Sequence, residues 1–319
     1  MAVDLSVSFA GVQFANPVFS ASGTYGHGLE MSHFVSPAKL GALVGKTVTR
    51  RPRPGNAPPR MAETPSGMLN SIGLENRGIE HYRKEVLPTL RGCGTRVISN
   101  IGAESIDDFA FLAEQLDSED GVSALEVNLS CPNVGGGKLP FSTDCRNAEA
   151  AIRAVRERTR KPILAKLSPN VTSIAEIARA VEAAGADGIT AINTLLGMAI
   201  DWRRRAPMLS TTVGGLSGPA IKPVALRMVF EVARAVRIPV VAAGGVRCAD
   251  DVAEFLVAGA SAVQVGTWNF VDPTGIGTIV DDLERILEAA RVASVRSLIG
   301  SLRSPAPVRF EQADALVER

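Results

Sequence analysis

The chain has 319 residues, of which 46% are hydrophobic and 21% are charged. This balance is typical of a folded protein with a large core and argues against intrinsic disorder. The formal net charge is +1, and aromatic residues make up only 5% of the chain. Because neither a general electrostatic attraction nor a base-stacking surface is expected, the composition argues against nucleic acid and membrane as partners.

The four cysteines, Cys93, Cys131, Cys145 and Cys248, show no Cys-x-x-Cys spacing. We therefore expect neither a zinc site nor an iron–sulfur cluster held by this chain alone. So few cysteines in a chain of this length indicate a reducing compartment. The N-terminus has no basic start before an apolar run, and no apolar stretch approaches the roughly 20 residues that span a bilayer. These features predict a cytoplasmic protein without a signal peptide.

Residues 3–14, VDLSVSFAGVQF, alternate apolar and polar side chains and predict a short hairpin. Eight short apolar runs follow, each of the length and character of a buried parallel strand. Amphipathic, alanine-rich segments lie between most of them, for example residues 143–160, 173–185 and 248–259, and a glycine ends the last two, as a helix C-cap requires. The runs are residues 16–23, 41–49, 95–102, 123–130, 161–168, 187–193, 238–246 and 261–267.

Eight strand-then-helix units predict an α/β fold of the (β/α)8 barrel type, whose usual size is about 250 residues. We expect residues 1–319 to form one such domain, with the hairpin closing the bottom of the barrel. Residues 195–222 separate the sixth strand from its helix and are too many for an ordinary loop. They predict a small excursion over the barrel mouth. A doubly wound open sheet is the alternative, but it fits eight regular repeats less well.

Every predicted strand ends in residues with polar side chains or in glycines, which expose their backbone. In a (β/α)8 barrel the chemistry lies where the strands end, so these groups would converge on one mouth. Singly, an asparagine there is often a turn former and a lysine is often solvated, but their number favours a shared site. The residues at the strand ends are Ser22, Gly23, Lys46, Thr47, Asn100, Asn128, Lys166, Asn193, Thr194, Gly244, Gly245, Gly266 and Thr267.

The glycines after the seventh and eighth strands, in AAGGV and VGT, stand where this fold usually binds phosphate. A phosphate, two lysines and several amides suit flavin mononucleotide (FMN). Lys166 is placed to stabilise the negative charge that the pyrimidine edge of a flavin gains on reduction. The same lysine also suits a Schiff-base lyase, and the pattern alone leaves that alternative open.

Seven motifs, in order along essentially the whole chain, resemble dihydroorotate dehydrogenase. Within that family, the GGLSGPAIKP segment and a cysteine rather than a serine at 131 resemble class 1. The similarity is greatest to the catalytic subunit of the NAD-linked class 1B enzymes. The motifs are SASGTYG, GKTVT, LNSIGLEN, VNLSCPN, AKLSPN, GGLSGPAIKPVALRMV and AAGGV.

The resemblance implies that Cys131 removes the C5 proton of dihydroorotate while the C6 hydride passes to N5 of FMN. The product is orotate, in de novo pyrimidine (UMP) biosynthesis. Lys46 is implied to act in catalysis and to contact both flavin and substrate. The substrate would be held by Lys46, Asn70, Ser71, Ile72, Gly73, Leu74, Asn128, Asn193 and Thr194. The flavin would be lined by Ser22, Lys46, Thr47, Asn100, Asn128, Lys166, Ile192, Gly218, Gly244, Gly245, Gly266 and Thr267.

The loop that carries Cys131, CPNVGGGKLPF, contains three consecutive glycines and predicts a mobile lid that closes the base over the substrate. Two features depart from the family pattern. Ser142 stands where glycine is usual, at the far end of this lid, and residues 201–212 are unusually rich in arginine. We expect Ser142 to alter the motion of the lid. The arginine-rich segment leaves open whether the surface around it contacts a partner.

Electrons must leave the flavin, and the chain carries no dinucleotide fingerprint or cluster spacing. A class 1B enzyme therefore implies a second subunit with FAD and a [2Fe–2S] cluster, in a heterotetramer built on a dimer of this chain. A class 1A homodimer using fumarate is the alternative. Class 2 is disfavoured, since it implies a serine base and an N-terminal membrane helix. A non-catalytic phosphate-binding barrel is a further alternative.

Overall fold

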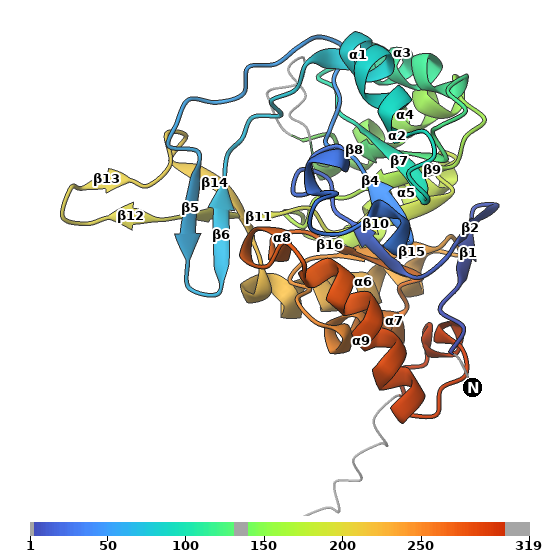
Figure 1. The fold of residues 1–319 in the computed structure, drawn as a ribbon. Helices are drawn as coiled ribbons and strands as arrows, with labels where there is room; N and C mark the ends of the chain where they lie inside the picture. The colour runs from blue at the N-terminus through green and yellow to red at the C-terminus, as the bar shows by residue number, and fades with distance from the viewer. Residues whose placement is uncertain (1–2, 131–139, 304–319) are drawn as a thin grey trace, which may run out of the picture.

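The computed structural model describes residues 3–130 and 140–303. Eight parallel strands close into a barrel in chain order, so the predicted (β/α)8 fold is confirmed (Figure 1). Every strand lies within one of the predicted apolar runs. The strands are β3 (Val18–Ser20), β4 (Ala42–Val44), β7 (Arg96–Ile101), β8 (Ala124–Asn128), β9 (Ile163–Lys166), β10 (Gly188–Ala191), β15 (Val240–Ala243) and β16 (Ala262–Val265).

Helices follow the strands and cover the barrel with their apolar faces. In α3, for example, Phe109, Leu112 and Leu116 recur at helical spacing and are buried against the barrel. The α-helices are α1 (Gly78–His81), α2 (Leu87–Leu90), α3 (Ile106–Asp117), α4 (Cys145–Arg156), α5 (Ile174–Ala183), α6 (Lys222–Ala235), α7 (Ala249–Ala258), α8 (Trp268–Val271) and α9 (Gly275–Ala289). A π-helical turn, η3 (Tyr82–Val86), joins α1 to α2. The 3-10 turns are η1 (Leu29–Met31), η2 (Pro37–Lys39), η4 (Phe141–Thr143), η5 (Pro219–Ile221) and η6 (Val295–Leu298).

Local chemistry sets the helix ends where the pattern predicted them. The side chains of Asp144 and Ser173 accept hydrogen bonds from backbone N–H groups in the first turns of α4 and α5. Gly185 and Gly259 follow α5 and α7 with φ of 100° and 119°, a left-handed conformation that glycine adopts without a Cβ penalty. Each cap returns the chain directly to the next barrel strand.

The N-terminal hairpin, β1 (Val7–Phe9) and β2 (Val12–Phe14), pairs antiparallel as predicted. Phe14 stacks on Phe9 with ring centroids 4.6 Å apart and packs against Phe19 of β3 at 4.8 Å. Arg96, the first residue of β7, donates to the carbonyl of Gln13 at 3.2 Å. The hairpin therefore lies at the N-terminal ends of the strands and leaves the opposite end free for a site.

The predicted excursion after the sixth barrel strand is also confirmed. Its strands are β11 (Leu195–Met198), β12 (Ile200–Asp201), β13 (Ala206–Pro207) and β14 (Val213–Ser217), and β12 and β13 form a hairpin. Two strands that the sequence pattern missed, β5 (Met61–Thr64) and β6 (Gly67–Asn70), join β14 and β11 in one antiparallel sheet. This sheet projects from the barrel, with the β12–β13 hairpin at its far end (Figure 1).

Among residues 3–130 and 140–303, none of the helices combines the length and apolar character needed to cross a lipid bilayer.

Candidate active site

A cavity of about 390 Å³ opens where the barrel strands end. Residues at the C-terminal ends of all eight strands reach it, and β6 and β14 of the projecting sheet form part of its wall. Its volume falls in the range of small-molecule sites. The predicted site residues that line it are Ser22, Lys46, Thr47, Asn70, Ile72, Gly73, Leu74, Asn100, Asn128, Lys166, Ile192, Asn193, Thr194, Gly218, Gly244, Gly245, Gly266 and Thr267.

Two predicted site residues stand apart from this set. Ser71 lies between lining residues but is not itself part of the cavity wall; its backbone N–H donates to the carbonyl of Arg60, and its carbonyl accepts from Asn56 Nδ2. Cys131, the predicted base, lies outside the described residues, as does most of the predicted lid. The described residue before it, Ser130, donates its backbone N–H to Asn128 Oδ1 at 3.2 Å.

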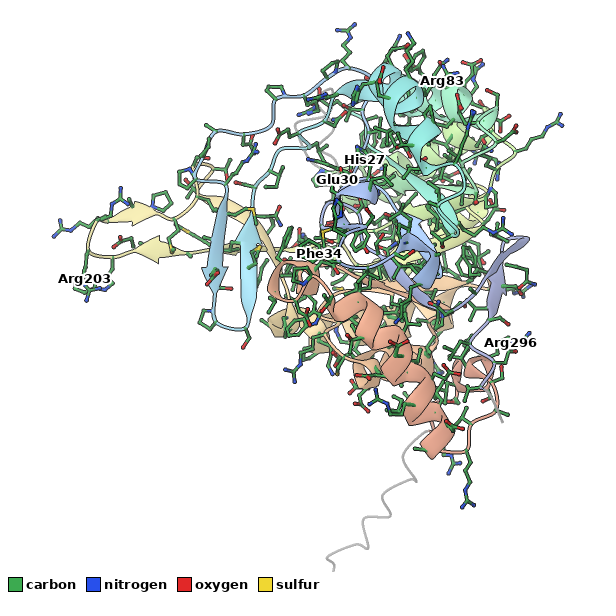
Figure 2. All side chains as sticks on the ribbon, viewed as in Figure 1. His27, Glu30, Phe34, Arg83, Arg203 and Arg296 are labelled. Atoms are coloured by element: carbon green, nitrogen blue, oxygen red, sulfur yellow. The ribbon has the colours of Figure 1, made fainter. Side chains whose placement is uncertain are left out.

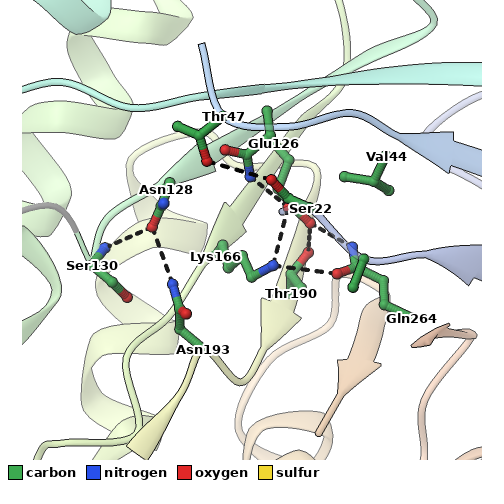
Figure 3. Close-up of polar contacts among 12 residues, drawn as sticks. Ser22, Val44, Thr47, Glu126, Asn128, Ser130, Lys166, Thr190, Asn193 and Gln264 are labelled. Carbon is green, nitrogen blue, oxygen red and sulfur yellow. Dashed lines mark hydrogen bonds and ion pairs between the residues drawn. The ribbon is translucent and has the colours of Figure 1, made fainter. Parts of the chain in front are cut away.

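The floor of the cavity rests on a buried carboxylate that sequence reasoning missed. Glu126 of β8 is fully buried and accepts hydrogen bonds from four side chains on four other strands (Figure 3). These donors are Asn100 Nδ2 at 2.6 Å, Gln264 Nε2 at 2.5 Å, Thr190 Oγ1 at 2.8 Å and Lys166 Nζ at 3.4 Å. A buried charge is tolerated only when paired and hydrogen-bonded, and here both conditions are met.

An amide pair stands above this floor at the ends of β8 and β10. Asn193 Nδ2 donates to Asn128 Oδ1 at 3.2 Å (Figure 3). Asn193 Oδ1 accepts from the backbone N–H of Thr194 at 2.8 Å. These bonds set the rotation of the Asn193 amide, because its oxygen and nitrogen are both engaged. Within residues 3–130 and 140–303, Asn128 Nδ2 donates to no protein atom, and Asn128 lines the cavity.

Lys46, after β4, also lines the cavity, and His27 lies near it. The backbone N–H of Lys46 donates to the carbonyl of Gly26 at 2.9 Å, next to His27. The His27 ring packs on Tyr82 with centroids 5.3 Å apart, and Glu30 accepts from the His27 backbone N–H at 3.0 Å (Figure 2). Burial lowers the pKa of His27, Lys46 lowers it further, and Glu30 opposes the shift.

The lowered pKa of His27 predicts a pH-dependent stability. The unfolded chain binds a proton at His27 near the ordinary pKa of 6.5, before the folded protein does, so the free energy of unfolding should fall as the pH drops below that value. His27→Gln should reduce this loss when urea midpoints at about pH 7.5 and about pH 5.5 are compared. His33→Gln, at an exposed position, is the control. Equal pH dependence in the two variants would refute the assignment.

The far end of the cavity is made of backbone at Gly244, Gly245, Gly266 and Thr267. A Cβ at Gly245 would stand 2.7 Å from Lys222 Cβ, and φ there is 81°, so only glycine fits this turn. Among the described residues, the backbone N–H groups of Gly245, Gly266 and Thr267 donate to no other protein atom. Free N–H groups in a concave turn form a site for an anion such as phosphate.

Several residues that sequence reasoning did not single out also line the cavity. Arg60 and Glu75 form an ion pair at its wall, and Met61 and Met68 come from the unpredicted strands β5 and β6. No motif signal marked these residues. Ser142, where the family pattern has glycine, is buried, and its Oγ accepts from the backbone N–H of Ser168 at 3.2 Å. Ser142 therefore ties the chain after the predicted lid to the end of β9.

Comparison with known proteins agrees with this geometry. Residues 4–287 match the family model described as dihydroorotate dehydrogenase. The chain belongs to the dihydroorotate dehydrogenase family. Similar members of this family cover nearly the whole chain. A protein of Geotalea uraniireducens is 51% identical over 94% of this chain and 98% of its own length, and one of Geobacter sulfurreducens is 50% identical over the same shares.

A third family member, from Porphyromonas gingivalis, is 49% identical over 92% of this chain and 95% of its own length. All three relatives bear the name "Dihydroorotate dehydrogenase B (NAD(+)), catalytic subunit". The family resemblance inferred from the seven motifs is thus confirmed. Within the dihydroorotate dehydrogenases, the similarity is to the NAD-linked type, as the motifs indicated.

Proposed function

We propose that this chain is the catalytic subunit of an NAD-linked dihydroorotate dehydrogenase. In this role it oxidises dihydroorotate to orotate in pyrimidine biosynthesis, with FMN as its cofactor. The observation that carries the proposal is that lysines, amides and free glycine N–H groups converge on one cavity at the strand ends. Relatives that bear the name of this NAD-linked subunit are 51% and 49% identical to the chain, and they support the choice of substrate and acceptor.

The polar groups of the cavity fit FMN. Asn100 Oδ1 is buried and has no hydrogen-bond partner among the described residues, so it is available to a ligand donor. Lys166 Nζ uses two of its three N–H groups on described residues, so it offers positive charge and a donor, and the glycine end offers N–H groups to a phosphate. When bound, FMN supplies a hydride acceptor, N5 of its ring. Ser22, Thr47, Asn128, Ile192 and Gly218 complete the proposed lining.

Asn70, Asn128 and Asn193 are proposed to hold the substrate. Dihydroorotate has planar amide edges, and an asparagine side chain offers each edge a donor and an acceptor. Lys46 and the backbone of residues 70–74 suit its carboxylate, because an ammonium and N–H groups form charge-assisted hydrogen bonds. Thr194 lies directly beside Asn193, whose amide it helps to orient. Ser71 takes part in this proposal only as a member of the 70–74 loop, because its own backbone N–H already donates to the carbonyl of Arg60.

Cys131 is proposed as the base that removes the C5 proton. It follows Asn128 by three residues, and Asn128 is at the end of β8 on the cavity wall. A thiolate beside cationic groups is a competent base when water is excluded. Lys46 is proposed to assist by holding the carboxylate of the substrate so that its C5–H faces the thiolate.

A partner subunit with FAD and a [2Fe–2S] cluster is proposed to carry electrons to NAD, in a heterotetramer built on a dimer of this chain. The projecting sheet supports a protein contact. Leu196 and Trp202 are 68% and 70% exposed there, and Met198 and Ile200 are also exposed. These side chains lie on residues 196–202, across β11, β12 and the turn that follows, and exposed apolar side chains gathered in this way mark interaction surfaces. Arg203, at the outer hairpin, points away from the barrel (Figure 2).

Anaerobic addition of dihydroorotate to the FMN-loaded chain is expected to bleach the flavin absorbance within one turnover. The reduced chain alone should transfer electrons to NAD very slowly, and rapid transfer should require the co-purified partner subunit. Fumarate offered in place of NAD serves as the acceptor control. A protein that cannot be loaded with FMN, or one that is trapped covalently by borohydride with a carbonyl substrate, would refute the proposal.

A further inference from the structure

Glu126 is a buried carboxylate beneath the cavity floor, and the roles proposed above do not use it. Its side chain is 0% exposed and does not line the cavity, whereas Asn100, Lys166 and Gln264, which it binds, all do. Figure 3 shows the carboxylate at the centre of these contacts. Glu126 therefore lies one layer below the surface that a ligand would touch.

The carboxylate dictates how the floor residues are turned. A carboxylate only accepts hydrogen bonds, so Asn100 must present its Nδ2 to Glu126, and its Oδ1 is left for another donor. Gln264 is held at both ends, because Nε2 donates to Glu126 and Oε1 accepts from Lys166 at 3.4 Å. The floor thus offers one acceptor, Asn100 Oδ1, and one charged donor, Lys166 Nζ.

The same carboxylate offsets the charge of the lysine. Lys166 Nζ and Glu126 Oε1 are 3.4 Å apart, with side-chain exposures of 8% and 0%. Charges interact strongly in such a water-poor interior, so a ligand on the floor is influenced by the pair and not by the ammonium alone. A ligand that gains negative charge when it is reduced is then stabilised less than it would be by an unpaired lysine.

We propose that Glu126 is a positioning residue that sets the donor–acceptor pattern of the cavity floor and lowers the reduction potential of the bound flavin. The inference rests on the proposed function, because it requires FMN above this floor. It assigns to the chain a control of flavin potential that acts through Asn100 and Lys166 and needs no contact between Glu126 and the cofactor.

Glu126→Gln tests this directly. Removal of the negative charge leaves the Lys166 ammonium uncompensated, so reduced FMN should be favoured over oxidised FMN at least tenfold more than in the wild type. For a two-electron couple, that factor corresponds to an upward shift of about 30 mV. The potential is measured by anaerobic titration of the FMN-loaded chain against a reference dye. A potential equal to or below that of the wild type would overturn the inference.

Thr190→Val is the matched second variant, in case Glu126→Gln does not fold or hold FMN. It keeps the charge and approximate volume but removes the hydroxyl that donates to Glu126 Oε2 at 2.8 Å. With one donor fewer, the carboxylate should exert more negative charge on the floor and shift the potential downward. If Glu126→Gln cannot be loaded, an unchanged or raised potential in Thr190→Val overturns the inference. A wild-type chain that does not bind FMN would instead refute the proposed function.

Discussion

Replacement of Cys131 by alanine is expected to slow the reduction of bound FMN by dihydroorotate by about 10²–10⁴-fold, the usual contribution of a positioned base. FMN should remain bound, because the groups proposed to hold it lie at or just after the ends of the barrel strands, or at Gly218 after β14, and not on the segment that carries Cys131. Anaerobic stopped-flow measurement of flavin bleaching gives the rate, and the visible spectrum before mixing gives the FMN content.

Cys145→Ala is the control for this experiment. Cys145 begins α4, does not line the cavity and is a free thiol. Its loss should leave the rate of flavin reduction unchanged. Reduction of Cys131→Ala at a rate close to that of Cys145→Ala would remove Cys131 from the role of base. Loss of FMN from Cys131→Ala would show that the residue acts in cofactor binding.

Lys166→Met is expected to cost about 3–5 kcal/mol of unfolding free energy and to weaken FMN binding. The substitution leaves the buried carboxylate of Glu126 without its cation, and an uncompensated buried charge is strongly destabilising. Urea unfolding of the FMN-free chain measures the loss of unfolding free energy separately from the loss of cofactor binding. The double variant Lys166→Met with Glu126→Gln should regain part of the loss, since no buried charge then remains.

An exposed ion pair provides the comparison for that stability loss. Lys39 pairs with Asp281 on the surface, where the side chains are 38% and 59% exposed. Lys39→Met should cost less than about 1 kcal/mol, because water screens such pairs. Equal urea midpoints for Lys39→Met and Lys166→Met would show that the Lys166–Glu126 pair contributes no more than a surface contact.

The sheet beside the barrel illustrates where sequence patterns lose information. The excursion was predicted from its length, but β5 and β6 were not, because their sequences, MAET and GMLN, are short and show neither an apolar run nor an apolar–polar alternation. These strands form because β14 offers β6 a partner edge, with Gly215 opposite Asn70. A strand of this kind is stabilised by pairing with a segment about 145 residues away, and no local preference reveals it.

The sequence by itself determined the barrel and the identity of most groups at its mouth. Apolar runs, amphipathic helices and capping glycines are local signals, and a parallel barrel places all strand ends together whatever the details. The tertiary structure decided how Glu126 joins that site. Its strand reads ALEVN, and only the register that sets Asn100 beside Glu126 and Asn128 beside Lys166 shows which side chains meet. Register depends on closure of the whole barrel, so residues far apart in sequence become neighbours only when all eight strands are in place.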